Sequence, residues 1–181
     1  MQGRSIPRVL ISEAAIRDRV RALAKRIDEA YPEGEELLLV GVLRGAFIFL
    51  ADLSRAMERS HVIDFIAVSS YGMGSQSSGD VRLVLDLREP IAHKHVLIVE
   101  DIVDTGYTLR YLLDSFAARK PASLRTCALV RKAERHEVEI DVDFLGFDIP
   151  DVWVVGYGLD YADQHRSLPY IGELDPEDLE A

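Results

Sequence analysis

The sequence contains a single cysteine and no long apolar segment. Cys127 cannot form an intrachain disulfide, and its place in the apolar run Cys127–Val130 predicts a buried thiol rather than a nucleophile. The longest apolar runs are much shorter than a membrane span, and the first residues show no signal peptide. We therefore expect no membrane partner and a cytoplasmic location, where thiols stay reduced.

Positive charge is also scarce. There are 21 Lys and Arg residues against 31 Asp and Glu residues, and the formal net charge is −10. Because nucleic-acid binding normally needs a basic surface, we expect no nucleic-acid partner. Local cations can still attract a small anionic substrate into one cleft. Arg44, Lys132 and Arg166 are the candidates for that role.

The remaining composition fits one globular domain over residues 1–181. An apolar content of 48% allows a sizeable core. Strand-like runs alternate with helical segments, which predicts an α/β fold with a mostly parallel, twisted sheet flanked by helices. Helices are expected over residues 13–30, with Ser12 as N-cap, 45–57 and 107–119. Strands are expected over residues 37–42, 62–71, 81–87, 96–99, 124–130, 143–147 and 152–155. The Gly- and Ser-rich segment at about 71–80 predicts a flexible loop.

The segment from Val96 to Thr108 carries the strongest functional signal. Its apolar start predicts a buried parallel strand, and Glu100 and Asp101 stand where we expect that strand to end. Ligands of α/β proteins bind at this edge of the sheet. Thr105–Thr108 then form a small-residue turn at a helix start, which favours a bound phosphate. The two carboxylates would repel a bare phosphate, but they suit a ribose diol or a metal ion.

This segment resembles the phosphoribosyl diphosphate signature of type I phosphoribosyltransferases. Other segments resemble the hypoxanthine-guanine enzymes of that family, and they occur in the same order along nearly the whole chain. These segments are Leu43–Gly45, Ser69–Gly72, Lys132, Phe144–Phe147, Ile149–Asp151, Val154–Tyr161, Arg166 and Leu168–Ile171. The resemblance implies the type I fold, with a small hood subdomain built from the N-terminal segment and residues 150–181. It also implies that the loop at 71–80, which Ser70 and Tyr71 begin, closes over the site.

The resemblance further implies a Mg²⁺-dependent enzyme of purine salvage. Such an enzyme transfers the 5-phosphoribosyl group from phosphoribosyl diphosphate to N9 of hypoxanthine or guanine, and it releases IMP or GMP and diphosphate. The family commonly forms dimers or tetramers, so we expect a homodimer or homotetramer. Asp104 matches the general base that exchanges a proton with N7 of the purine.

The other site residues implied by the resemblance fall into three groups. The ribose-phosphate group comprises Glu100, Asp101, Ile102, Val103, Thr105, Gly106, Tyr107 and Thr108, with Glu100 and Asp101 also near Mg²⁺. The diphosphate group comprises Leu43, Arg44, Gly45 and Arg166, with a cis peptide at Leu43–Arg44. The purine group comprises Lys132, Trp153, Val154 and Asp160, with Asp160 also near a second Mg²⁺. Arg44 and Tyr107 both stand where many relatives carry lysine.

Plainer interpretations exist for these residues. On composition alone, Asp104 could be a turn or N-cap residue, Lys132 a solvated charge, Trp153 a core residue and Asp160 a surface turn. RNA-binding regulators share the fold, although the acidic balance disfavours them. A xanthine-preferring transferase is a closer alternative, because the purine 2-position is read largely by backbone groups. The choice among hypoxanthine, guanine and xanthine therefore stays open.

Overall fold

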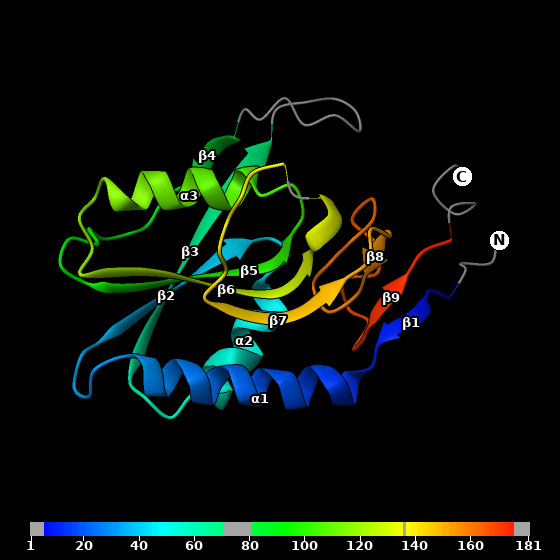
Figure 1. Ribbon diagram of the computed structural model, residues 1–181, viewed down its shortest axis with the longest axis horizontal. Coiled ribbons are helices and arrows are strands. Elements are labelled where there is room, and N and C mark those ends of the chain that lie inside the picture. The colour runs from blue at the N-terminus through cyan, green and yellow to red at the C-terminus, as the bar shows by residue number, and fades with distance from the viewer. Residues whose placement is uncertain (1–5, 71–80, 136, 176–181) are drawn as a thin grey trace.

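The computed structural model describes residues 6–70, 81–135 and 137–175, and these ranges form two sheets and three α-helices (Figure 1). The large sheet has the order β4-β3-β2-β5-β6-β7, and the small sheet the order β1-β9-β8. The helices are α1 (Glu13–Ala30), α2 (Phe47–Ala56) and α3 (Tyr107–Ala117). The strands are β1 (Arg8–Ile11), β2 (Leu37–Leu43), β3 (His61–Ser70), β4 (Val81–Leu85), β5 (His95–Val103), β6 (Ser123–Lys132), β7 (Phe144–Ile149), β8 (Val154–Val155) and β9 (Ile171–Glu173).

The large sheet is parallel except for its edge strand β4, which pairs antiparallel with β3. Helices cover both of its faces: α1 and α2 lie on one side and α3 on the other (Figure 1). Each face has its own apolar core. Parallel pairing places the carboxyl ends of β2, β5 and β6 at one edge. The predicted α/β fold with a mostly parallel sheet is confirmed.

Helix α1 illustrates how the pattern of apolar residues sets the packing. Ile16, Val20, Leu23 and Ile27 recur every three or four residues, and all four are buried against the sheet. The predicted N-cap is confirmed, because the Ser12 hydroxyl accepts a hydrogen bond from the backbone N–H of Ala15 at 3.3 Å. No helix in the described ranges has both the length and the apolar character needed to cross a membrane.

Several predicted boundaries were wrong. Strand β5 continues to Val103, so Glu100 and Asp101 lie within it, because their backbone pairs onward with β6. Strand β6 likewise continues beyond its predicted end at Val130 to Lys132, because Lys132 pairs with Ile149 of β7. The N-cap of α3 is Gly106, so the interpretation of Asp104 as that cap was also wrong.

The small sheet joins the two ends of the chain, and two of its strands were not predicted. Strand β1 pairs antiparallel with β9, which in turn pairs with β8. Arg8 lies opposite Glu173, and their side chains form an ion pair. Residues 8–11 therefore pack beside the segment from 154 to 173.

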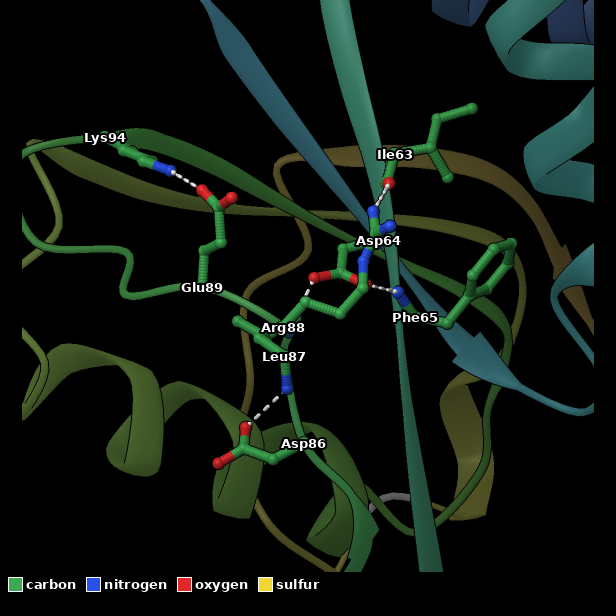
Figure 2. A network of polar contacts seen from close by, with 8 residues as sticks. All are labelled: Ile63, Asp64, Phe65, Asp86, Leu87, Arg88, Glu89 and Lys94. Atoms are coloured by element: carbon green, nitrogen blue, oxygen red, sulfur yellow. Dashed lines mark hydrogen bonds and ion pairs between the residues drawn. The ribbon is translucent and has the colours of Figure 1, made fainter.

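A polar network fixes the connection between β4 and β5 to strand β3 (Figure 2). Asp64 accepts hydrogen bonds from the backbone N–H groups of Phe65 and Arg88, both at 2.9 Å, and from Nε of Arg88 at 3.1 Å. Arg88 also donates to the carbonyl of Ile63. Burial acts to raise the pKa of Asp64, but these donors outweigh it and hold the pKa below its usual value. Asp64 is therefore a carboxylate whose charge stabilises the fold.

Candidate active site

A cavity of about 250 Å³ opens at the carboxyl edge of the large sheet. It brings together the end of β2, the last residues of β5 and the turn that begins α3. The lining residues are Val42, Leu43, Gly45, Glu100, Asp101, Ile102, Val103, Asp104, Thr105, Gly106, Thr108 and Leu109. The predicted ribose-phosphate group, apart from Tyr107, thus shares one cavity with two residues of the predicted diphosphate group.

Glu100 and Asp101 are the electrostatic centre of this cavity. Glu100 is only 5% exposed, and its Oε1 has no hydrogen-bond partner in the described chain. Burial, and then the adjacent charge of Asp101, raise the pKa of Glu100 well above its usual value. Burial also raises the pKa of Asp101 to about 6, although backbone N–H groups and Arg166 oppose that rise. The site therefore holds two acids that lack the partners needed to offset their burial.

Two glycines allow three segments to meet beside these acids. A Cβ atom on Gly45 would lie 1.7 Å from Oδ2 of Asp101, and one on Gly158 would lie 2.0 Å from the carbonyl oxygen of Gly45. Any larger side chain would force these segments apart. The peptide bond between Leu43 and Arg44 is cis, a feature that the resemblance to the family implied and that the sequence alone could not establish.

The turn from Thr105 to Thr108 is anchored from outside the cavity. Gly106 has a φ of +93°, and its Cβ position would lie 2.9 Å from the carbonyl oxygen of Val138. The carbonyl of Thr105 accepts hydrogen bonds from the N–H groups of Glu137 and Val138 at 3.1 and 3.2 Å. Tyr107 points away to Glu137, to which its hydroxyl donates at 3.1 Å. The turn at the start of α3 is therefore rigidly held, which suits binding of an anion.

On the predicted purine side, Lys132 is 4% exposed, so its interpretation as a solvated charge was wrong. Its Nζ lies 3.3 Å from Oδ1 of Asp151 and 5.8 Å from the ring centroid of Trp153. Trp153 is 49% exposed and meets Tyr161 edge to face, so it is not a core residue. Val154 is buried in β8. A buried ammonium thus lies beside a half-exposed aromatic ring.

The predicted diphosphate cations converge on two acids. Arg166 contacts Asp160 at 2.7 Å and Asp163 at 3.1 Å, and it donates to the carbonyl of Gly158 at 2.8 Å. Arg44 reaches the same carboxylate of Asp163 at 3.1 Å. Sequence reasoning missed Asp163, because nothing in its local sequence shows that both arginines will fold onto it.

Two more charged residues escaped sequence reasoning. Arg135 lies 3.5 Å from Oδ1 of Asp104 and 3.5 Å from Oδ1 of Asp151. Asp151 belongs to a segment that resembles the family, but the resemblance suggested no role for it. Of the predicted lid residues, Ser70 ends β3, whereas Tyr71 and the loop to residue 80 lie outside the described residues.

A magnesium ion would fit this site only together with substrate oxygens. Among the described residues, no three His, Cys, Asp or Glu side chains converge so that they could hold a metal by themselves. Mg²⁺ typically takes one or two protein carboxylates and completes its shell with phosphates and water. Glu100 and Asp101 match that requirement, because one of their buried oxygens has no partner.

The fold and site define an α/β protein with a cavity at the carboxyl edge of a parallel sheet, between an acid pair and a turn of the kind that suits an anion. The chain belongs to the phosphoribosyltransferase family, since the family model "Phosphoribosyl transferase domain" matches residues 11–162.

Comparison with individual relatives shows which members of the family this chain resembles. The chain is 48% identical to the hypoxanthine phosphoribosyltransferase of Escherichia coli strain K12, over 92% of this chain and 94% of that protein. It is 45% identical to the hypoxanthine-guanine phosphoribosyltransferase of Dictyostelium discoideum, over 93% and 96%. A solved structure of Trypanosoma cruzi hypoxanthine phosphoribosyltransferase superposes with a TM-score of 0.91 at 43% identity, covering 99% of this chain and 97% of that one.

Proposed function

We propose that this chain catalyses the Mg²⁺-dependent transfer of 5-phosphoribosyl from phosphoribosyl diphosphate to N9 of hypoxanthine or guanine. The products are IMP or GMP and diphosphate, and the reaction serves purine salvage. The observation that carries the proposal is the buried pair Glu100 and Asp101 beside the anchored turn Thr105–Thr108, in one cavity. Similarity to hypoxanthine and hypoxanthine-guanine phosphoribosyltransferases supports the purine specificity.

Opposite charges develop at the two ends of the bond that breaks in this reaction. Positive charge builds on the ribose as the bond from C1′ to the diphosphate oxygen breaks, and negative charge builds on the diphosphate. Glu100 and Asp101 orient the ribose hydroxyls and place negative potential near the cationic sugar. The turn from Thr105 to Thr108 holds the 5′-phosphate, so the sugar stays fixed while its leaving group departs.

The departing diphosphate lies between the cis loop and the arginines. Backbone N–H groups around Leu43–Gly45, together with Arg44 and Arg166, bind it. A Mg²⁺ ion near Glu100 and Asp101 and a second one near Asp160, both held largely by substrate oxygens, would neutralise the leaving group.

Purine selection depends on Asp104 and Lys132. Asp104 exchanges a proton with N7 while N9 attacks C1′. Lys132 donates to the 6-oxo group, and since its ammonium is buried, an adenine amino group opposite it would be strongly disfavoured. Trp153 covers one face of the base, with Val154 and Asp160 at its edge.

A spectrophotometric assay with Mg²⁺ and phosphoribosyl diphosphate tests the function. Hypoxanthine, guanine, xanthine, adenine and uracil are supplied separately. We expect turnover of hypoxanthine or guanine but not of adenine or uracil, and a loss of about 100-fold or more in kcat for Asp104→Ala. Turnover of none of these bases would refute the proposal. Xanthine as the best substrate would replace it with the xanthine-preferring alternative.

We also propose that the enzyme is a cytoplasmic homodimer or homotetramer. Its buried, reduced thiol Cys127 suits a reducing compartment. In the Trypanosoma cruzi relative, the C-terminal region has a role in the oligomeric state, and this chain resembles that relative over nearly its whole length. Light scattering of the purified protein checks the assembly, and a monomer at micromolar concentration would contradict it.

A further inference from the structure

We propose that Arg135 is a positioning residue that orients the general base and couples it to the purine-binding lysine. The inference deepens the proposed function and rests on it. Arg135 ends the short 3₁₀ segment Ala133–Arg135, which directly follows β6. The resemblance to the family assigned this arginine no role.

Four charged groups of alternating sign form a chain across the purine side of the site. Asp104 Oδ1 lies 3.5 Å from Nε of Arg135, and Nη1 of Arg135 lies 3.5 Å from Oδ1 of Asp151. The same oxygen of Asp151 lies 3.3 Å from Nζ of Lys132. Arg135 and Asp151 therefore connect the base, which follows β5, to the 6-oxo donor at the end of β6.

The contact between Arg135 and Asp104 has the length expected of a positioning interaction. Oδ1 of Asp104 is buried and has no hydrogen bond in the described chain, so the guanidinium lies within ionic reach of it without donating to it. A direct charge-assisted hydrogen bond would compete for this oxygen with the proton from the purine. At 3.5 Å the arginine can hold the carboxylate in place and leave this oxygen to the substrate.

The backbone around Arg135 is itself fixed to the phosphate turn. Glu137 and Val138, just after the 3₁₀ segment, donate to the carbonyl of Thr105, the residue that follows Asp104. Arg135 therefore keeps its place relative to Asp104 through main-chain hydrogen bonds as well as through its side chain. Replacing the side chain should leave this backbone anchor intact and change only the orientation of the charged groups.

Arg131 provides a matched control. It lies four residues earlier, in β6, pairs with Asp148 through Nε at 2.7 Å, and is not one of the residues that line the cavity. Its side chain is 27% exposed and that of Arg135 is 35% exposed. Partly exposed ion pairs of this kind contribute little to stability. Loss of either one should therefore leave thermal unfolding nearly unchanged, and any difference in activity would reflect function.

The test compares Arg135→Gln, Arg135→Lys and Arg131→Gln in steady-state kinetics, varying hypoxanthine and phosphoribosyl diphosphate in turn with Mg²⁺ present. For Arg135→Gln we expect kcat/KM for hypoxanthine to fall about tenfold or more, with KM for phosphoribosyl diphosphate within about twofold of wild type. Arg135→Lys should recover part of the loss, and Arg131→Gln should match wild type.

Other outcomes overturn the inference. It fails if Arg135→Gln keeps the wild-type kcat/KM, if its effect equals that of Arg131→Gln, or if it weakens both substrates alike. Should Arg135→Gln not fold, Arg135→Lys decides: a reduced kcat/KM for hypoxanthine supports the role, and a wild-type value refutes it. A wild-type enzyme that turns over none of the bases refutes the proposed function itself, a result distinct from a failure confined to the Arg135 variants.

Discussion

Replacing Asp101 with asparagine should stabilise the unliganded protein while it impairs the site. Burial raises the pKa of this carboxyl from 3.8 to about 6, against the opposing effect of backbone N–H groups and Arg166. A carboxyl whose pKa is higher in the folded than in the unfolded state costs stability once both states are ionised. This rise corresponds to about 3 kcal/mol at most, and partial solvent exposure of the side chain reduces it to about 1 to 2 kcal/mol.

Asp101→Asn keeps the shape and one acceptor oxygen but removes the charge. At pH 7.5, with chelator and without substrate, we expect the melting temperature to rise by about 2 to 6 °C. The wild type begins to take up its proton as the pH falls below about 6, and the cost is relieved by about pH 4. The advantage of the variant should therefore be full above about pH 7 and shrink steadily between about pH 6 and pH 4.

Differential scanning fluorimetry over this pH range measures the effect, and Asp64→Asn gives a control of opposite sign. Hydrogen bonds from Arg88 and Phe65 hold the pKa of Asp64 below its usual value despite its burial. Asp64→Asn should therefore lose stability at neutral pH, and its deficit should shrink only as the pH falls below about 4. The reasoning would be wrong if Asp101→Asn melted below wild type at pH 7.5, or if its advantage did not depend on pH.

Three other changes test separate parts of the structure. Gly45→Ala places a methyl group against the Asp101 carboxylate, so we expect at least about a 100-fold loss of kcat/KM; near-normal activity would show that the loop can move aside. Arg59→Ala removes hydrogen bonds to four backbone carbonyls and a contact with the ring of Tyr31. We expect it to lower the free energy of unfolding, measured in urea, by about 2 to 3 kcal/mol and to leave kcat unchanged. An unchanged midpoint would refute that estimate. Lys132→Met should lower kcat/KM for hypoxanthine about 100-fold or more and reduce the ratio of kcat/KM for hypoxanthine to that for adenine. An unchanged ratio would show that the lysine does not recognise the 6-oxo group.

The buried parallel strands and the long helices were predictable because their signals are local. The run Leu37–Val42 is apolar because the whole strand segment is buried. The apolar residues of α1 recur at helical spacing because one face of the helix is buried. Their ends were less predictable. Glu100 and Asp101 belong to β5 because the neighbouring strand β6 offers backbone N–H and C=O groups for hydrogen bonds. A polar side chain does not prevent this backbone pairing.

The small sheet escaped prediction for a related reason. Strands β1 and β9 are short, and each is stabilised by a partner about 160 residues away in the chain. Neither segment has enough alternation to indicate a strand by itself. Their pairing depends on tertiary contacts that bring residues 8–11 and 171–173 together.

Some residues of the candidate site could likewise be predicted from the local sequence, whereas others depend on contacts between distant segments. The contiguous acid pair and phosphate turn could be read from Val96 to Thr108, but the partners of the site's charges could not. Gly45 shows why. The resemblance to the family marks it as a residue of the diphosphate loop but does not show what it touches, whereas in the structure its missing Cβ is what allows the cis loop to lie against Asp101. That close approach helps to bury the acid pair, and burial is the first cause of the raised pKa of both acids. A change in the predicted diphosphate loop should therefore alter the protonation of the acid pair.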